Sequence, residues 1–109
     1  MLRATLAADS ANALVALTPE LGAVLQMRGT SGQGTDTYAH DWNPSVPSWI
    51  KLVRKDGLLT AYWSVEGTMW YPIGSASDTL PPTVFLGFAV SSHDAATSTW
   101  AGFSDFTFQ

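Results

Sequence analysis

The chain has 109 residues, of which 46% are hydrophobic and 13% are charged, with a net charge of −4 and no cysteine. This length and apolar content predict one domain over residues 1–109 and argue against disorder. Five basic residues leave no electrostatic footprint for nucleic acid or an anionic membrane surface. Without cysteine there is no disulfide, no thiolate zinc site and no cysteine nucleophile, and no apolar run is long enough for a membrane-spanning helix.

The first quarter of the chain predicts three short strands. Residues 2–6 alternate, residues 12–18 are apolar on both faces as in a strand inside a sandwich, and residues 23–28 form the third run. No secretory signal is visible, because residues 1–6 already read as a strand. The sequence alone leaves open whether an export signal has been removed or the chain is cytoplasmic as it stands.

Residues 29–48 are predicted to form the longest irregular segment. The segment begins with small and polar residues and then carries four chemically richer ones before two prolines: Tyr38, His40, Asp41 and Trp42. A loop of about 20 residues is uncommon in a compact domain and usually signals function or disorder.

A three-stranded meander over Trp49–Trp70 and the residues after it is the best-defined feature of the sequence. Asp56-Gly57 separates two alternating apolar runs, and both residues tolerate the positive φ that a type I′ hairpin turn needs. The third strand covers residues 70–75, and Pro72 within it indicates an edge position or a bulge.

Two further strands are expected after the meander. Residues 84–90 are apolar on both faces and are predicted to form a central strand, and residues 100–108 are predicted to close the fold. Eight short strands and no helix predict an all-β fold, an antiparallel β-sandwich of the jelly-roll type.

Several segments together resemble a bacterial family of concanavalin A-like (LamG-like) jelly-roll domains. They are Met1–Ser10, Val15–Pro19, the meander Trp49–Trp70, Val84–Asp94 and Phe103–Phe106. In the family the meander runs approximately W-[VL]-K-L-V-R-x-G-x-x-F-T-A-Y-x-S-x-D-G-x-x-W. The resemblance implies a secreted, extracellular protein associated with carbohydrate chemistry, and it implies sugar binding.

The chain departs from the family pattern in ways that matter for assembly. Ala4 stands where the family has an acidic residue, and Leu59 and Trp63 replace Phe or Tyr. Strands that precede the position of Met1 in the family have no counterpart here, which would leave a sheet edge and part of the core open. We therefore expect a homodimer or a higher homo-oligomer.

The candidate ligand-binding residues are mostly in the segment before the meander. Sugar rings present apolar C–H faces that stack on aromatic rings, while carboxylate, amide and imidazole groups bind hydroxyls. Tyr38, His40, Asp41 and Trp42 supply this combination, and Trp63 and Trp100 are second choices. Two interpretations of Trp42 remain: it stacks on a glycan, or it folds back as a plug over the core. Trp49 and Trp70 are expected to be core or sheet-covering residues.

A non-catalytic, lectin-like carbohydrate-binding module is the favoured function, and two alternatives stand beside it. One is an assembly module that self-associates through an exposed sheet face. The other is a small glycoside hydrolase that uses two carboxylates among Asp36, Asp41, Glu66 and Asp94. Residues 92–94, Ser-His-Asp, cannot form a catalytic relay, because adjacent strand residues point to opposite faces. No cofactor or metal site is expected; calcium is compatible with a jelly roll, but no loop signature for it is present.

Overall fold

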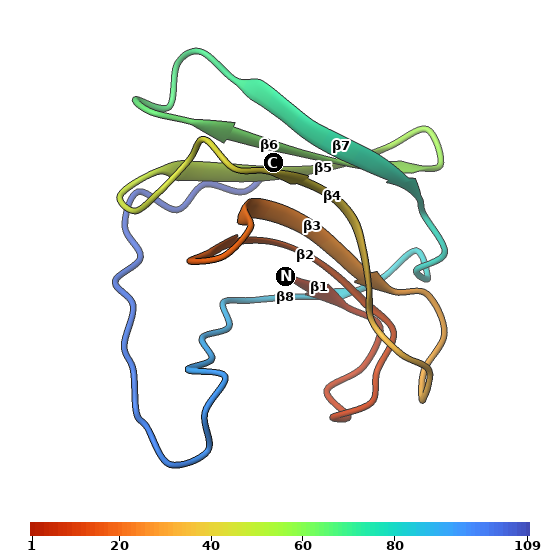
Figure 1. The fold of residues 1–109 in the computed structure, drawn as a ribbon. Helices are drawn as coiled ribbons and strands as arrows, with labels where there is room; N and C mark the ends of the chain where they lie inside the picture. Colours follow the sequence, from red (N-terminus) through yellow and green to blue (C-terminus); the bar gives the residue numbers. More distant parts are fainter.

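In the computed structural model, which describes residues 1–109, the chain forms two layers of antiparallel β-sheet and no helix (Figure 1). The strands are β1 (Leu2–Arg3), β2 (Asn12–Thr18), β3 (Gly22–Arg28), β4 (Asp36–Asp41), β5 (Trp49–Lys55), β6 (Leu58–Ser64), β7 (Tyr71–Ser77) and β8 (Phe85–Leu86). The five-stranded sheet has the order β4-β3-β2-β1-β8, and the three-stranded sheet has the order β5-β6-β7. The predicted all-β antiparallel sandwich is confirmed, and its jelly-roll topology stays a prediction.

The meander forms as the sequence predicts. Strands β5 and β6 pair in continuous register from Trp49↔Ser64 to Lys55↔Leu58. The turn residues Asp56 and Gly57 have φ of 54° and 76°, the positive values that a type I′ turn requires. Strand β7 is an edge strand with an irregularity beside Pro72, so the expectation from that proline is confirmed.

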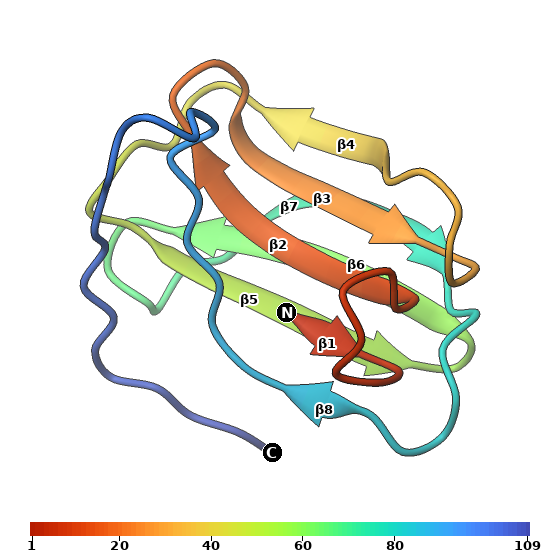
Figure 2. The same cartoon turned by 90° about the horizontal axis from the view of Figure 1, so that it is seen from below.

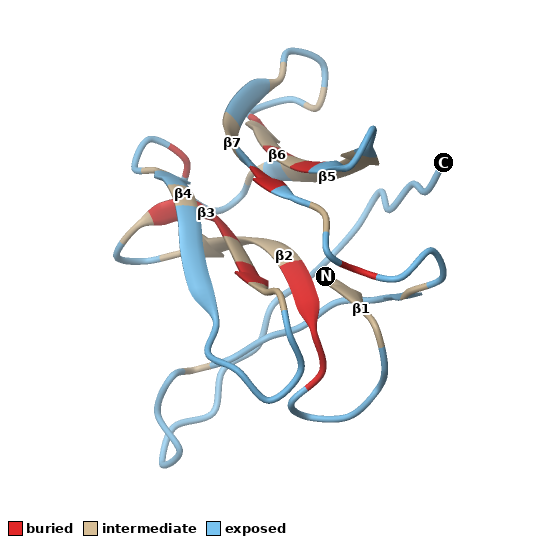
Figure 3. Ribbon diagram, turned by 90° about the vertical axis from the view of Figure 1, so that its right-hand side faces the viewer, coloured by how far each residue is buried: buried red, intermediate tan, exposed pale blue.

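The core between the sheets is small and rich in alanine. It consists of Ala11, Ala13, Leu25, Met27, Leu59, Ala61, Ala76 and Leu80. Small side chains let the two layers approach closely: a Cβ atom added to Gly74 on β7 would lie 2.3 Å from the Cβ of Ala39 on β4. Figure 3 shows the buried segments gathered on β2, β3 and the facing strands, whereas the C-terminal segment is exposed.

The two sheets do not match in width. The three-stranded sheet lies over β2, β3 and β4, and no Cα atom of β1 or β8 lies within 8 Å of a strand of that sheet. Figure 2 shows β1 and β8 at one margin of the five-stranded sheet, with β8 at its edge. The five-stranded sheet therefore extends past the three-stranded sheet at β8, its edge strand, whereas Leu2 of β1 still packs against the core.

One prediction about the connecting segments is wrong. Residues 29–48 were expected to be irregular, but Asp36–Asp41 form β4 and pair with β3. Only Ala39 and Asp41 of this strand are partly buried, so its sequence lacks the alternation of apolar and polar residues that would have predicted a strand. A bulge pairs Gln26 with Thr37 and Leu25 with Ala39, which leaves Tyr38 as the extra residue.

Two predictions in the C-terminal part of the chain are also wrong. Residues 84–90 were expected to be a central strand, but only Phe85–Leu86 pair, at the edge of the five-stranded sheet. Residues 100–108 form no strand. Two of their aromatic rings instead join a surface cluster, in which Phe88 stacks on Phe103 at 4.5 Å and meets the edge of Phe106 at 5.2 Å.

The first strand is shorter than residues 2–6 suggested. After Arg3 the chain turns, and the backbone N–H groups of Ala4 and Thr5 donate to the carbonyl of Ala11 and the hydroxyl of Ser10. Alternation in the sequence does not separate this hydrogen-bonded turn from a longer strand.

Candidate functional site

The candidate site lies at one end of the sandwich. The connection from β4 to β5, which begins with Trp42, and the connection from β6 to β7 lie at the same end in both Figure 1 and Figure 2. Beside these connections a side-chain hydrogen bond joins the end of β4 to β6, and Asp41 accepts it.

Asp41 fixes the local geometry with both carboxylate oxygens. Its Oδ1 accepts hydrogen bonds from the backbone N–H of Asn43 at 3.0 Å and from the Asn43 side-chain amide at 2.8 Å. Its Oδ2 accepts a 2.7 Å hydrogen bond from the indole N–H of Trp63 on β6. The first pair of bonds forms an Asx turn that ends β4, and the last bond ties β4 to the opposite sheet.

These donors also stabilise the charged form of Asp41. The pKa of the carboxyl group is lowered, chiefly by the backbone N–H of Asn43; partial desolvation opposes this, and the side chains of Trp63 and Asn43 add to the lowering. A general acid needs a raised pKa, so Asp41 is poorly suited to that role. Its role is to position the residues around it.

Trp42 is exposed, but the backbone that carries it is held. Its side chain is 69% exposed, so the interpretation of Trp42 as a plug over the core is wrong. The indole ring meets the imidazole of His40 edge-on, with centroids 4.2 Å apart. Gly22 packs against the chain here: a Cβ atom at Gly22 would lie 2.9 Å from the Cα of Trp42 and 2.1 Å from the carbonyl oxygen of Asp41. The aromatic face is thus presented to solvent from a fixed backbone.

Trp63 extends the aromatic surface toward the β6–β7 connection. Its ring packs against Tyr71 on β7, with centroids 4.9 Å apart. Tyr71 in turn borders an open hollow of about 270 Å³, lined also by Ser64, Val65, Glu66, Thr68 and Met69. The hollow has apolar and polar walls, including hydroxyl groups and a carboxylate, and Tyr71 is the aromatic residue that borders it.

The structure gathers four of the six candidate residues and separates two. His40, Asp41, Trp42 and Trp63 are linked by the contacts above. Tyr38, 51% exposed, lies at the bulge of β4 and takes part in none of these contacts. Trp100 is 86% exposed on the C-terminal segment, and its ring packs against no other aromatic ring.

Sequence reasoning missed Tyr71 and its hollow. The available signal was the register of the meander, since the pair Trp63↔Tyr71 follows once both turns are placed. Trp49 and Trp70, expected to be core or sheet-covering, cover the sheet. The ammonium group of Lys51 lies 4.2 Å from the Trp70 ring centroid on the face opposite the core, and a Cβ at Gly67 would lie 2.8 Å from the Trp49 ring.

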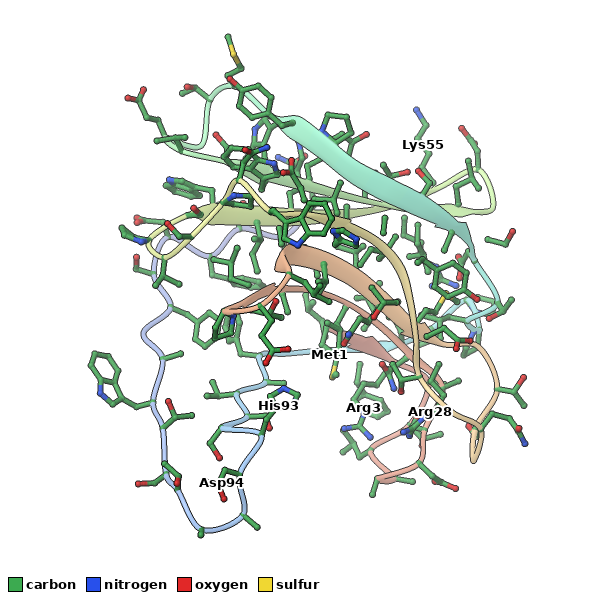
Figure 4. All side chains as sticks on the ribbon, in the orientation of Figure 1. Met1, Arg3, Arg28, Lys55, His93 and Asp94 are labelled. Atoms are coloured by element: carbon green, nitrogen blue, oxygen red, sulfur yellow. The ribbon has the colours of Figure 1, made fainter.

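Glu66 lines the hollow, whereas the candidate carboxylate Asp94 lies apart from this site (Figure 4). The Ser92 hydroxyl donates to the carbonyl of Asp94, and the carboxylate of Asp94 accepts from the backbone of Ala96 and the hydroxyl of Thr97. These two bonds, the backbone one first, lower the pKa of Asp94. No group of three His, Asp or Glu side chains is placed to hold a metal ion.

No family model matches the chain, and neither the curated protein sequences nor the solved structures contain a match. The resemblance to concanavalin A-like domains therefore stays a prediction. The structure has no helix of the length and apolar character that crossing a membrane requires.

Proposed function

We propose that this chain is a non-catalytic, lectin-like module that binds a neutral glycan across the end of the sandwich. The observation that carries the proposal is Trp42, a large aromatic side chain 69% exposed on a backbone fixed by the Asp41–Asn43 turn and by Gly22. Holding an indole face toward solvent before binding reduces the entropy that a ligand must remove. A solvent-exposed aromatic residue fixed in this way is suited to stacking on a sugar ring.

The surrounding groups suit an uncharged, hydroxyl-rich ligand. His40 beside Trp42 and the Glu66 and Thr68 groups of the hollow offer hydrogen-bonding atoms next to aromatic surface. Tyr71, 43% exposed, supplies a second ring on the far side of Trp63. Trp42 and Tyr71 would then contact different sugar units of one chain, with Asp41 and Trp63 holding the two parts in place.

Affinity electrophoresis on gels containing soluble neutral polysaccharides tests this proposal. We expect retardation of the wild type by at least one polysaccharide and loss of retardation in Trp42→Ala. Trp100→Ala removes an equally large and more exposed indole away from the site and is the matched control, which should remain retarded. Normal migration of the wild type on every polysaccharide would contradict the proposal.

Self-association is a second candidate function, favoured by the unequal width of the two sheets. β8 is the edge strand of the five-stranded sheet and lies outside β5 in Figure 2, with Phe85 and Leu86 exposed. Beyond β8, the chain exposes the aromatic residues Phe88, Phe103 and Phe106. A second copy that packs there would bury this surface and produce the homodimer expected from the sequence. Light scattering that reports a monomer at micromolar concentration would exclude this function.

A further inference from the structure

We propose that Arg3 and Arg28 form a binding site for a tetrahedral oxyanion, a phosphate or sulfate monoester, away from the glycan site. Arg3 on β1 and Arg28 at the end of β3 both pair in register with Asn12 on β2. The three side chains therefore form a row on one face of the sheet. Figure 4 shows the two labelled guanidinium groups beside one another below the five-stranded sheet.

Both arginines converge on the short connection between β1 and β2. Arg3 donates to the carbonyl of Ala7, and Arg28 donates to the carbonyl of Ala8 at 3.1 Å. Adjacent carbonyl groups thus bring two positive charges together at one place on a chain whose net charge is −4. Neither arginine loses its charge in a protein, so the pair is a permanent cationic site.

No carboxylate neutralises this pair. The one ion pair of the structure joins Arg54 to Asp78, and no carboxylate oxygen lies within 4.0 Å of a nitrogen of Arg3 or Arg28. The hydrogen bonding is also incomplete, because the Nε atoms of both arginines and the Oδ1 atom of Asn12 are buried without a partner. Asn12 is only 6% exposed. Buried polar groups are normally satisfied, so the two Nε–H donors lack acceptors, which an oxyanion supplies, whereas Asn12 Oδ1 lacks a donor, which an oxyanion supplies only through a protonated P–OH group.

The chemistry of the missing component follows from the donors. Guanidinium groups bind phosphate and sulfate oxygens through paired N–H donors, and two of them together favour a group with more than one anionic oxygen. Arg3 also lines a hollow of about 220 Å³ whose other walls include Leu6, Phe85 and Phe88. An apolar wall beside the cation suits an ester whose organic part is small and apolar, with its oxyanion on the arginines.

Backbone amide chemical shifts test the site in the intact chain. The probes are inorganic phosphate, inorganic sulfate, phenyl phosphate and phenyl sulfate, with ionic strength held constant by sodium chloride. We expect saturable shifts for residues 4–12 and 28, with the phenyl esters binding more tightly, and the ratio of phosphate to sulfate affinity identifies the source of the oxyanion. Equal affinity for the inorganic and phenyl forms would overturn the role of the hollow.

Matched variants separate a site from general charge attraction. Arg28→Gln and Lys55→Gln remove the same charge, but Lys55 lies in the exposed β5–β6 hairpin, away from the arginine pair (Figure 4). We expect at least about tenfold weaker binding for R28Q and unchanged binding for K55Q. If R28Q does not fold, R28K keeps the charge without the two-pronged donor and should bind several-fold more weakly. No saturable shift in the wild type, or equal losses in R28Q and K55Q, would overturn the proposal.

Discussion

The indole N–H of Trp63 donates a 2.7 Å hydrogen bond to Oδ2 of Asp41, and this bond joins the two sheets at the end where the candidate site lies. Trp63 comes from the meander, and Asp41 is the last residue of β4. The same carboxylate closes the turn that presents Trp42. The Asp41 side chain therefore couples the position of the exposed Trp42 indole to the packing of Trp63 against Tyr71.

Asp41→Asn should loosen this end of the sandwich. The amide can still accept from Asn43, but its NH₂ group cannot accept from the Trp63 indole, which leaves a partly buried donor unsatisfied. We expect a loss of about 1–3 kcal/mol in the free energy of unfolding and a change in the near-ultraviolet circular dichroism of tryptophan. Asp36→Asn, at the exposed start of β4, makes the same chemical change and should alter neither quantity.

Gly22→Ala should be strongly destabilising. Gly22 has φ of 68°, and an added Cβ would lie 2.1 Å from the carbonyl oxygen of Asp41, so both the backbone conformation and the packing oppose alanine. Gly57→Ala is the matched control, because Gly57 has φ of 76° but open space around it. Urea unfolding should show a loss of about 1 kcal/mol for Gly57→Ala and of more than about 3 kcal/mol for Gly22→Ala. Equal losses would show that the contact with Asp41 adds nothing.

The stability of the fold should fall in acid. Partial desolvation would raise the pKa of Asp78, but hydrogen bonds from Arg54 and from the backbone of Leu80 outweigh it, and the pKa is lowered. The pKa of Asp41 is lowered as well. A group with a lowered pKa in the folded state stabilises the fold above its unfolded pKa, and this contribution disappears as the pH falls through the folded pKa.

Chemical unfolding at a series of pH values below about 4 checks this dependence. The wild type should lose stability steadily over this range. Asp78→Asn should be less stable than the wild type at neutral pH and should show a shallower loss in acid, because it lacks one of the carboxylates whose pKa is lowered in the folded state. An unchanged slope in Asp78→Asn would show that the ion pair with Arg54, at 2.5 Å, does not contribute.

If the β8 edge of the sandwich mediates self-association, the aromatic cluster beside it should be required. Phe103→Ser with Phe106→Ser removes both rings that pack on Phe88 from a segment without strand pairing, so the sandwich itself should fold. Sedimentation at several concentrations should show a dimer for the wild type and a monomer for the double variant. A double variant that dimerises as strongly as the wild type would place the interface elsewhere.

The sequence predicts those parts of the fold that depend on residues close together in the chain. The Asp56-Gly57 turn and the alternation on either side specify the β5–β6 hairpin, and the two-sided apolar run of β2 predicts a covered strand. Strand β4 could not be predicted, because it is polar and depends on backbone pairing with β3. Residues 84–90 and 100–108 have strand-like composition, but only Phe85–Leu86 pair with a partner strand, β1, so their apolar pattern does not produce the expected strands.

In the candidate site, too, local features could be predicted from the sequence and long-range contacts could not. His40, Asp41 and Trp42 are contiguous, so their residue types alone suggested a binding segment. The bond from Trp63 to Asp41 and the hollow beside Tyr71 depend on how the two sheets face each other, which no local pattern encodes. Trp100, like Trp42, follows polar residues in the sequence. The two differ in their surroundings in the fold, because Trp42 meets the ring of His40 beside the Asp41–Asn43 turn, whereas Trp100 packs against no other aromatic ring.

Tryptophan fluorescence during titration with soluble neutral glucans and xylans tests the central claim most directly, because binding should cover the exposed Trp42 ring. The account predicts a saturable shift of the emission to shorter wavelength for the wild type and for Trp100→Ala, and no shift for Trp42→Ala. A wild type that shows no shift with any of these polysaccharides, or a Trp42→Ala variant that responds like the wild type, would contradict it.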